Sequence, residues 1–575
     1  MGQTPILRPL QPNGRITSVP RTSASAIGKP RWCNRLPHLL LALLALSALL
    51  STLLVTWSER SRAITAPILL GHYAVAGPLA TDGRAIVVAI PETADSTILL
   101  EVSGNERHAM LIRSAGQIPE LTLAQGTVLW LERSCTDCSG RIRALRLATR
   151  ETWTLAETGI RSGPRADGRW AAWVSRNGTD RLFVADLETS RQPPRILAVL
   201  PPEHEITDLQ LCAGRVAWVE ATRTEQWRIQ LQPVASADPP VTVLQGEGAP
   251  PSILLSNDAL ITIDQTMRVI SLDEPRLSVP IWESAPESVT TDGRYVFWID
   301  TVFLETGRRA IVAYDTLSKS RFLAVPDATH VSRLAVGGDQ LVWFQEHRPD
   351  DVSLWAAPIA DLLPTARRAK PERQNPTWRY FPETGHYLAN GFRHFWEQFG
   401  GASPFGFPLS EEFDEYDLDS GRFRTVQYFE RARFVWIPES PIALDGVVLD
   451  PIGVELVHQL GLASARAFRS PAAASNGAAM TSCRTFSETG HELCGPLLDA
   501  WLHIGSSVTA SLSSEEVALL ITGPAISEPI VLPDGTIVQY FERARLELRP
   551  QAEPERAISL GRIGAEILAA RDWLR

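Results

Sequence analysis

Two copies of a Glu-x-x-His sequence carry the residue types best suited to acid–base or metal chemistry in this chain. They are Glu383/His386 in FPETGH and Glu488/His491 in FSETGH. A carboxylate and an imidazole at this spacing can share a metal ion or act as acid and base. However, Thr-Gly lies between them, which is typical of a turn, and no third ligand lies at useful spacing. We therefore expect turn or capping hydrogen bonds, with ligand contact as the alternative, and we assign no catalytic residue, metal or cofactor.

Cysteine spacing points to disulfide chemistry. Cys135 and Cys138 form a CxxC within SCTDCSG, a segment typical of a hairpin tip. One CxxC is half of a zinc site and lacks a second pair nearby, and a thioredoxin-like motif would need a βαβ context. We favour a local disulfide there, with zinc and redox roles as alternatives. Cys483 and Cys494 flank FSETGHEL and are expected to pair, whereas Cys212 lies in a strand pattern and is expected in a core.

The Glu-x-x-His sequences belong to a duplicated C-terminal module. The copies span 379–462 and 482–575, with linkers expected at 363–378 and 463–481. Each copy also contains VQYFERAR, followed by Ile-Gly-x-Glu. The apolar spacing of GFRHFWEQF at 391–399 predicts an amphipathic helix, and the YFERAR strand is expected to be half-buried with a solvated ion-pair face. Each module is therefore predicted to be a small α+β unit.

Copy one also contains FGFPLSEE at 405–412, followed by Gln427-Tyr-Phe. This pair of segments resembles the LGFP-type repeats of actinobacterial cell-wall proteins. The duplicated modules also resemble modules in secreted proteins of filamentous green bacteria (Chloroflexi). The resemblance implies contact with cell-envelope material. Copy two keeps only GPAISE at 523–528, which departs from the pattern.

Residues 64–362 repeat with a period near 43. Each copy has a turn with Gly, often Asp-Gly-Arg, and then a β-branched and aromatic strand. Asp-Gly favours hairpin turns, so we expect these turns to be structural. Seven copies with about four strands each predict a seven-bladed β-propeller, and the pattern resembles the TolB-type and WD-type propeller families. The residues of one column are expected in the core between blades: Val88, Trp130, Trp173, Trp218, Ile263, Trp298 and Trp343.

A transmembrane helix is predicted over 38–58. Residues 39–57 read LLLALLALSALLSTLLVTW without a charge, and at ~1.5 Å per residue they span roughly 28 Å. Six basic residues and no acid lie in 1–37, which we expect to be a disordered tail. The positive-inside rule then predicts a single-pass cell-membrane protein with a cytoplasmic N-terminus and an extracytoplasmic bulk. A cleaved signal peptide, which would make the protein secreted, is the alternative.

Charge and missing motifs narrow the function. Beyond residue 37 the chain has 49 basic and 65 acidic residues, and such an acidic body lacks the basic face that nucleic-acid binding needs. No Gly-x-Ser-x-Gly, His-Glu-x-x-His, P-loop or Gly-x-Gly-x-x-Gly sequence occurs.

We therefore expect a mainly β, non-enzymatic, membrane-anchored binding or scaffold protein of the bacterial envelope. Its propeller would bind a protein or envelope partner, and its modules would contact wall or surface polymer. One alternative is a propeller-based extracellular enzyme, either a glycosidase or lyase or a peptidase-associated protein. That alternative predicts several acids and histidines converging at one propeller mouth. The other alternative is an assembly factor working like TolB.

Overall fold

The computed structural model describes residues 67–574, apart from 94–95, 104–106, 136–137, 190–191, 304–307, 349, 371–374, 442, 470–481, 505–511 and 554–556. The tail predicted at 1–37 and the transmembrane helix predicted at 38–58 lie outside the described residues, as does much of the linker predicted at 463–481. Within the described part of the chain, no helix is both long enough and apolar enough to span a bilayer.

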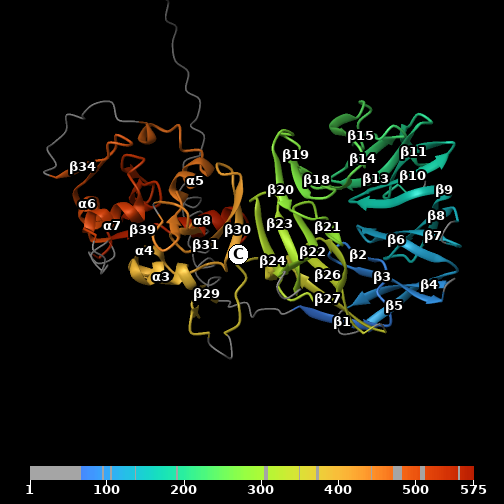
Figure 1. Ribbon diagram of the computed structural model, residues 1–575, viewed down its shortest axis with the longest axis horizontal. Coiled ribbons are helices and arrows are strands. Elements are labelled where there is room, and N and C mark those ends of the chain that lie inside the picture. The colour runs from blue at the N-terminus through green and yellow to red at the C-terminus, as the bar shows by residue number, and fades with distance from the viewer. Residues whose placement is uncertain are drawn as a thin grey trace, which may run out of the picture. The chain divides into compact units, whose positions relative to one another are not determined.

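Residues 68–358 form groups of four antiparallel strands arranged in a ring, which is the architecture of a β-propeller (Figure 1). The first three groups are β2 (Leu79–Thr81), β3 (Ile86–Thr93), β4 (Ser96–Ser103) and β5 (Arg107–Ser114); β6 (Gln117–Ala124), β7 (Thr127–Arg133), β8 (Gly140–Arg146) and the first half of β9 (Thr152–Asp167); and the second half of β9 with β10 (Trp170–Asn177), β11 (Thr179–Asp186) and β12 (Arg195–Val199). Strand β9 thus serves two groups, because its first half pairs with β8 and its second half with β10.

The remaining groups follow the same plan. They are β13 (His204–Cys212), β14 (Arg215–Thr222), β15 (Gln226–Pro233) and β16 (Val241–Glu247); β17 (Ser252–Leu255), β18 (Ala259–Ile263), β19 (Met267–Ser271) and β20 (Ser278–Trp282); β21 (Val289–Thr291), β22 (Tyr295–Phe303), β23 (Arg308–Asp315) and β24 (Ser320–Val325); and β25 (Val331–Gly337), β26 (Gln340–Arg348), β27 (Asp351–Pro358) and β1 (Ile68–Tyr73). Strand β1 therefore closes the ring, since the first described strand is the outer strand of the last group.

The repeated column of large residues lies between neighbouring groups. Each interface holds its own apolar cluster, and Trp130, Trp218 and Trp298 are among the largest fully buried side chains. The predicted core position is confirmed by the burial of Val88, Trp130, Trp173, Trp218, Trp298 and Trp343. Ile263 is only partly buried, because β18 ends there and Ile261 occupies the fully buried position instead.

The C-terminal modules repeat one order of elements after α2 (Ile359–Leu362). Module 1 contains β28 (Trp378–Phe381), β29 (His386–Ala389), α3 (Asn390–Gln398), α4 (Ala402–Phe405), β30 (Phe413–Asp417), β31 (Arg422–Tyr428), β32 (Arg433–Trp436), β33 (Val447–Leu449) and α5 (Ile452–Gln459). After a short turn, η1 (Arg466–Phe468), module 2 contains β34 (Cys483–Thr485), β35 (Glu492–Cys494), α6 (Gly495–Ile504), α7 (Ser514–Thr522), β36 (Ile530–Val531), β37 (Ile537–Tyr540), β38 (Arg545–Leu548), β39 (Ile558–Leu560) and α8 (Ile563–Ala570). The helix predicted at 391–399 is α3, which buries Phe392, Phe395 and Trp396.

Module 1 continues a sheet of the propeller. Strand β30 pairs with β24, with Arg321 opposite Asp414, so that one sheet runs from β21 through β24 into β33. Part of the predicted linker also packs into the fold, because Leu363 is buried and the Thr365 hydroxyl donates to the Trp573 carbonyl at 2.5 Å. The propeller and the modules are therefore joined by backbone pairing and by buried side chains.

The two modules interlock with pseudo-two-fold symmetry. The Gly453 N–H at the start of α5 donates to the Glu542 carbonyl at 3.0 Å, and the Ala565 N–H at the start of α8 donates to the Glu430 carbonyl at 3.2 Å. The turn of each VQYFERAR segment thus accepts hydrogen bonds from the start of the final helix of the other module. The reciprocity is that of an isologous dimer interface, here formed within one chain.

Arginines of the same repeats complete this interlock. The Arg431 Nε donates to the Leu560 carbonyl at 3.1 Å, and the Arg543 Nε donates to the Leu449 carbonyl at 3.1 Å. Repeat positions that look like a surface strand in sequence therefore satisfy backbone groups of the opposite module, which explains why the first arginine of ERAR is present in both copies.

Candidate functional site

The inner strands of the propeller enclose a central channel with a hollow toward each end. Strands β2, β6, β9, β13, β17, β21 and β25 line a hollow of about 560 Å³ where they end. A second hollow of about 590 Å³ lies where the same strands begin. Arg165 lines both hollows, as do Leu79, Leu121 and Leu334.

Arg165 on β9 makes side-chain contacts with two other inner strands. Its Nη1 donates to the Glu120 carboxylate at 2.8 Å, and its Nε donates to the Leu209 carbonyl at 3.2 Å. The guanidinium therefore connects β9 to both β6 and β13. A partly exposed ion pair of this kind contributes about 0–1 kcal/mol to stability.

The aspartates of the Asp-Gly-Arg turns lie at the first hollow and bind backbone. The Asp82 Oδ1 accepts from the N–H groups of Arg84 and Ala85 at 3.0 Å each, and its Oδ2 accepts from Gly126 N–H in the next group at 2.8 Å. Likewise the Asp167 carboxylate accepts from Ala213 N–H at 2.6 Å. The structural role predicted for these turns is confirmed, because each carboxylate closes its own turn or ties one strand group to the next.

Two of the channel carboxyls are partly buried. Burial raises the pKa of Asp208, whose oxygens accept the N–H groups of Leu209 at 2.7 Å and Ile253 at 2.8 Å. Burial also raises the pKa of Asp292, which accepts from Arg294 and Tyr295 N–H groups. No histidine lines either hollow among the described residues. If the propeller were an enzyme, acids and histidines should converge at one mouth of the channel. The described residues of the two hollows do not show this convergence.

Cys212 lies in the channel wall and is buried, as its strand pattern predicts. Its Sγ donates to the Asn257 Oδ1 at 3.5 Å. Burial, reinforced by the nearby Asp167 carboxylate, raises the pKa of Cys212 to about 12. A thiol held protonated in this way is a poor nucleophile.

The Glu-x-x-His sequences form hairpin turns rather than Glu–His pairs. The Gly385 N–H donates to the Phe381 carbonyl at 2.7 Å, and the equivalent Gly490 bond is also 2.7 Å. Glu383 and Glu488 are exposed. Buried His386 and His491 instead lie 3.2 Å from Glu411 and 3.0 Å from Glu528, respectively. The partner of each histidine therefore comes from the SEE or SEP segment, about 25 to 37 residues later.

A glutamine and a serine lie beside each histidine, and in the sequence they stand out only as parts of longer segments, without a predicted role. The Gln427 Nε2 donates to the carbonyls of Tyr387 and Ser410 at 2.7 and 2.9 Å, while the Ser410 hydroxyl accepts from Tyr428 N–H at 3.0 Å. Module 2 repeats every one of these bonds through Gln539 and Ser527. The duplicated VQY and the shared Ser-Glu could have revealed them, because both are kept in the two copies.

Both cysteine pairs form disulfides. Cys135 and Cys138 bridge a hairpin tip, with Cα atoms 5.1 Å apart, and Cys483 and Cys494 bridge β34 and β35, with Cα atoms 4.3 Å apart. Within the described ranges, the only group of metal-ligating side chains close enough to share an ion is Cys483, Glu492 and Cys494. Its two sulfurs are bonded to each other, so the thiolates that zinc requires are not present there.

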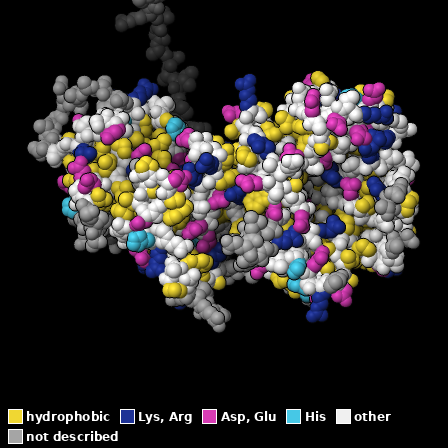
Figure 2. Space-filling view, viewed as in Figure 1, with side chains coloured by type: hydrophobic (Ala, Val, Ile, Leu, Met, Phe, Trp, Pro, Cys, Tyr) yellow, Lys and Arg dark blue, Asp and Glu magenta, His cyan; other side chains and the backbone are white. Residues whose placement is uncertain are grey.

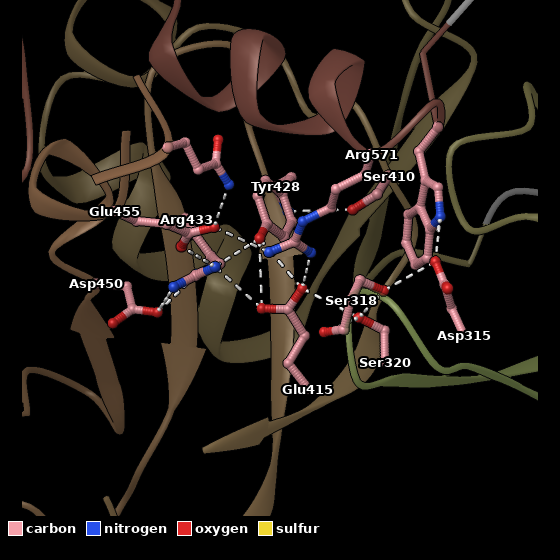
Figure 3. Close-up of polar contacts among 12 residues, drawn as sticks. Asp315, Ser318, Ser320, Ser410, Glu415, Tyr428, Arg433, Asp450, Glu455 and Arg571 are labelled. Carbon is pink, nitrogen blue, oxygen red and sulfur yellow. Dashed lines mark hydrogen bonds and ion pairs between the residues drawn. The ribbon is translucent and has the colours of Figure 1, made fainter. Parts of the chain in front are cut away.

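A buried ion network joins module 1, module 2 and the propeller (Figure 3). Glu415 on β30 contacts Arg571 and lies 3.1 Å from Arg433, and the Tyr428 hydroxyl donates to the same carboxylate at 3.1 Å. Arg433 also lies 2.9 Å from Glu455, and its side chain is 11% exposed. The ion-pair face of the YFERAR strand, expected to be solvated, is therefore buried, because the second module covers it.

A second set of contacts ties the C-terminal tail to the propeller. The Trp573 Nε1 donates to the Asp315 carboxylate at 3.0 Å, and the Arg294 Nη2 donates to the Arg571 carbonyl at 2.6 Å. Burial tends to raise the pKa of Glu415, but the charges of Arg571 and Arg433 lower it by more than burial raises it. The pKa of this carboxyl is therefore below its usual value, and the group stays ionised. The arrangement holds charges in fixed positions but offers no open, reactive group.

Charges on the surface are mixed. On the face shown in Figure 2, Lys and Arg lie interspersed with Asp and Glu over both the propeller and the modules. A mixed surface of this kind does not steer a ligand of one charge toward this face.

No protein-family model and no curated protein matches the sequence. Among solved structures, the chain is similar to TolB from Acinetobacter baumannii, with 14% identity over 40% of this chain and 60% of TolB and a TM-score of 0.29. It is also similar to the β-propeller domain of the Trilobed protease from Pyrococcus furiosus, with 10% identity over 49% of this chain and 95% of that chain and a TM-score of 0.38. A chain of the Mitotic Checkpoint Complex matches with 12% identity over 52% and 96% and a TM-score of 0.36. The chain thus spans about 60% of the length of TolB, and its assignment as a β-propeller protein rests on its own sheet topology.

Proposed function

We propose that this chain is a non-enzymatic binding scaffold of the bacterial cell envelope, with a seven-bladed propeller at 64–362 that binds a protein or envelope partner. The modules at 379–462 and 482–575 contact wall or surface polymer, and the helix at 38–58 anchors the chain with its bulk outside the cytoplasm. The observation that carries the proposal is the continuous sheet from β21 to β33. It fixes the modules against the propeller, which a scaffold needs and a hinged enzyme does not.

The channel supports binding over catalysis. Its carboxylates accept hydrogen bonds from backbone N–H groups of the propeller itself, which gives them a structural role. The burial that raises the pKa of Asp208 and Asp292 acts on residues that also hold strand ends in place. Such carboxylates stabilise the ring and leave partner recognition to the rims and outer strands.

An aromatic face on module 1 supports contact with polymer. Trp378 is 49% exposed and lies on the same face of the β28–β29 hairpin as Tyr380 and Tyr387. The hydroxyls of Tyr380 and Tyr387 donate to the carbonyls of Arg368 and Ala369 at 2.9 Å each, which fixes the rings. The exposed Trp378 ring packs edge-on against the fixed, partly buried Tyr387 ring, with centroids 5.7 Å apart, and offers an amphipathic surface at low entropic cost. Module 2 lacks these rings, so we assign polymer contact to module 1.

Retention on isolated cell wall tests the proposal. The full chain in detergent should cosediment with the wall, and Trp378→Ala with Tyr387→Ala should reduce retention about tenfold, which corresponds to ~1.4 kcal/mol. Leu418→Ala is the matched control, because Leu418 is 59% exposed on the same module and lies outside the aromatic face. Absence of wild-type retention would remove the wall-binding role. Co-purification with a membrane complex without such retention would instead favour an assembly factor.

A further inference from the structure

Strands β30 and β36 occupy equivalent edges of the two modules. Each is the first strand of a β-sheet with the same order, β30-β31-β32-β33 in module 1 and β36-β37-β38-β39 in module 2. Phe413 pairs with Val426, and Ile530 pairs with Val538, the same valine of the VQYFERAR repeat. Val531 and Leu532 therefore stand where Asp414 and Glu415 stand in module 1.

The edge of module 1 is occupied by the propeller. Strand β24, the outer strand of its group, pairs with β30 through Ser320 opposite Glu415 and Arg321 opposite Asp414. The Arg321 guanidinium donates to the Asp414 carboxylate at 2.8 Å. Within this chain, the first strand of module 1 thus pairs with the outer strand of a propeller blade.

The equivalent edge of module 2 has no strand beside it in the described part of the chain, since β36 ends its sheet. Its side chains are also different in kind. Val531 is 69% exposed and Leu532 is 37% exposed, where module 1 has two acids that meet propeller residues. An open strand edge with exposed apolar side chains is a template for pairing with another chain.

An outer strand with matching chemistry exists on the propeller. Strand β12 ends its sheet, and its Ile196 and Val199 are 45% and 58% exposed. A register shift in its pairing with β11 sets Ile196 opposite Phe183 and Val199 opposite Arg181, so both apolar side chains lie on one face. Other outer strands carry fewer such residues; β16 has Val241 alone, at 66% exposed.

We propose that β36 of one chain pairs with β12 of a second copy of this chain. The two edges differ, so the contact is heterologous: in a pair, one molecule keeps a free β12 and the other keeps a free β36. Repetition of the contact gives a head-to-tail assembly rather than a closed two-fold dimer. Because β36 is only two residues long, the pairing is weak, with a dissociation constant in the micromolar range or above, on the order of −8 kcal/mol or weaker. The inference does not depend on wall binding, since it uses only the chain's own strand edges.

Sedimentation velocity of the full chain in detergent tests this assembly with two complementary variants. Val531→Lys removes the apolar edge of module 2, and Ile196→Lys with Val199→Lys removes that of β12. Wild type should associate in a concentration-dependent way, and each variant alone should lose about tenfold or more in association constant. An equimolar mixture of the two variants should give a heterodimer and nothing larger, because one intact edge of each kind remains.

Val241→Lys is the matched control for β12, because it places the same charge on an equally exposed outer strand. It should associate like wild type, and unchanged circular dichroism and melting temperature should show that every variant is folded. A monomeric wild type, unchanged association of Val531→Lys, or the absence of a heterodimer in the mixture would each overturn the proposal. Association driven by the N-terminal segment would persist in Val531→Lys and would therefore count against it.

Discussion

Two glycines in the C-terminal modules mark positions where the backbone of the other module excludes any side chain. A Cβ on Gly453 would lie 2.0 Å from the Phe541 carbonyl oxygen, and a Cβ on Gly564 would lie 2.1 Å from the Phe429 carbonyl oxygen. Because the obstacle is backbone, it cannot rotate away. The Gly of each Ile-Gly-x-Glu sequence is thus a requirement of the interlock, and it is present for contact rather than for turn geometry.

Substitution of these glycines should separate the modules. We expect Gly453→Ala and Gly564→Ala each to cost about 1–3 kcal/mol or more through overpacking, measured as the free energy of unfolding in denaturant. Ala569→Ser on the exposed face of α8 should stay within about 0.5 kcal/mol of wild type. Equal stability of Gly453→Ala and the control would show that α5 does not dock on the opposite module.

Glu415 is the residue whose charge the junction most depends on. Its removal leaves Arg433 and Arg571 buried without this partner, so Glu415→Gln should cost about 3–5 kcal/mol. Glu92→Gln is the control, because it breaks the exposed pair with Arg113 and should cost no more than about 1 kcal/mol. Comparable losses for the two variants, measured by denaturant unfolding, would contradict a buried junction.

The pH dependence of the same residue follows from its lowered pKa. Two arginines hold the pKa of Glu415 below the unfolded value of about 4.3, against the effect of burial. Its contribution to stability is therefore present above pH ~4.3 and is lost as the pH falls through the folded pKa. The difference in unfolding free energy between wild type and Glu415→Gln should shrink as the pH is lowered below ~4.3. A constant difference would show that Glu415 is not ionised in the fold.

At the scale of elements, the first hairpins of the two modules differ in the residues that pair at their ends. In module 1 the end of the hairpin pairs Trp378 with Ala389, and in module 2 the equivalent pair is the Cys483–Cys494 disulfide. Module 1 thus has an aromatic face where module 2 has a covalent link. The module that lacks the aromatic rings compensates with a cross-link that restricts its unfolded chain.

Loss of that cross-link should lower the free energy of unfolding more than loss of the CxxC disulfide does. Cys483→Ser with Cys494→Ser opens a loop with a sequence separation of 11 and should cost about 2–3 kcal/mol, whereas the pair at Cys135 and Cys138 closes a separation of only 3 and should cost less. Calorimetry of the two double variants in the absence of reductant measures both. A larger loss at Cys135 and Cys138 would contradict the loop-length argument.

Local elements were predictable because their patterns are short in range. Asp-Gly turns before apolar strands indicate the repeats, and the spacing of Phe392, Phe395 and Trp396 indicates α3. Contacts between distant segments have no corresponding short-range pattern in the sequence. The partner of His386 is Glu411 and not Glu383, and the pairing of β24 with β30 joins residues about 95 positions apart, so neither follows from local spacing.

At the scale of the whole molecule, the ring depends on the first described strand. Leu70 on β1 is buried in a cluster with residues of the first and last strand groups, including Ile86 and Val342. Leu70→Ala should therefore cost about 2–5 kcal/mol in thermal or denaturant unfolding. Val75→Ala, at a position 40% exposed just after β1, should be nearly neutral. A neutral Leu70→Ala would mean that β1 does not hold the ring closed.

Closure by β1 also sets the order of events during synthesis. Ile68 leaves the ribosome 288 residues before its partner Ala356. At ~5–20 residues per second, this corresponds to a delay of about 15–60 s. During that time β1 has no partner strand and the ring cannot close. Long-range strand pairing of this kind is slow, and an unpaired strand edge is prone to aggregation. The ring can therefore close only after the last strand group has been synthesised.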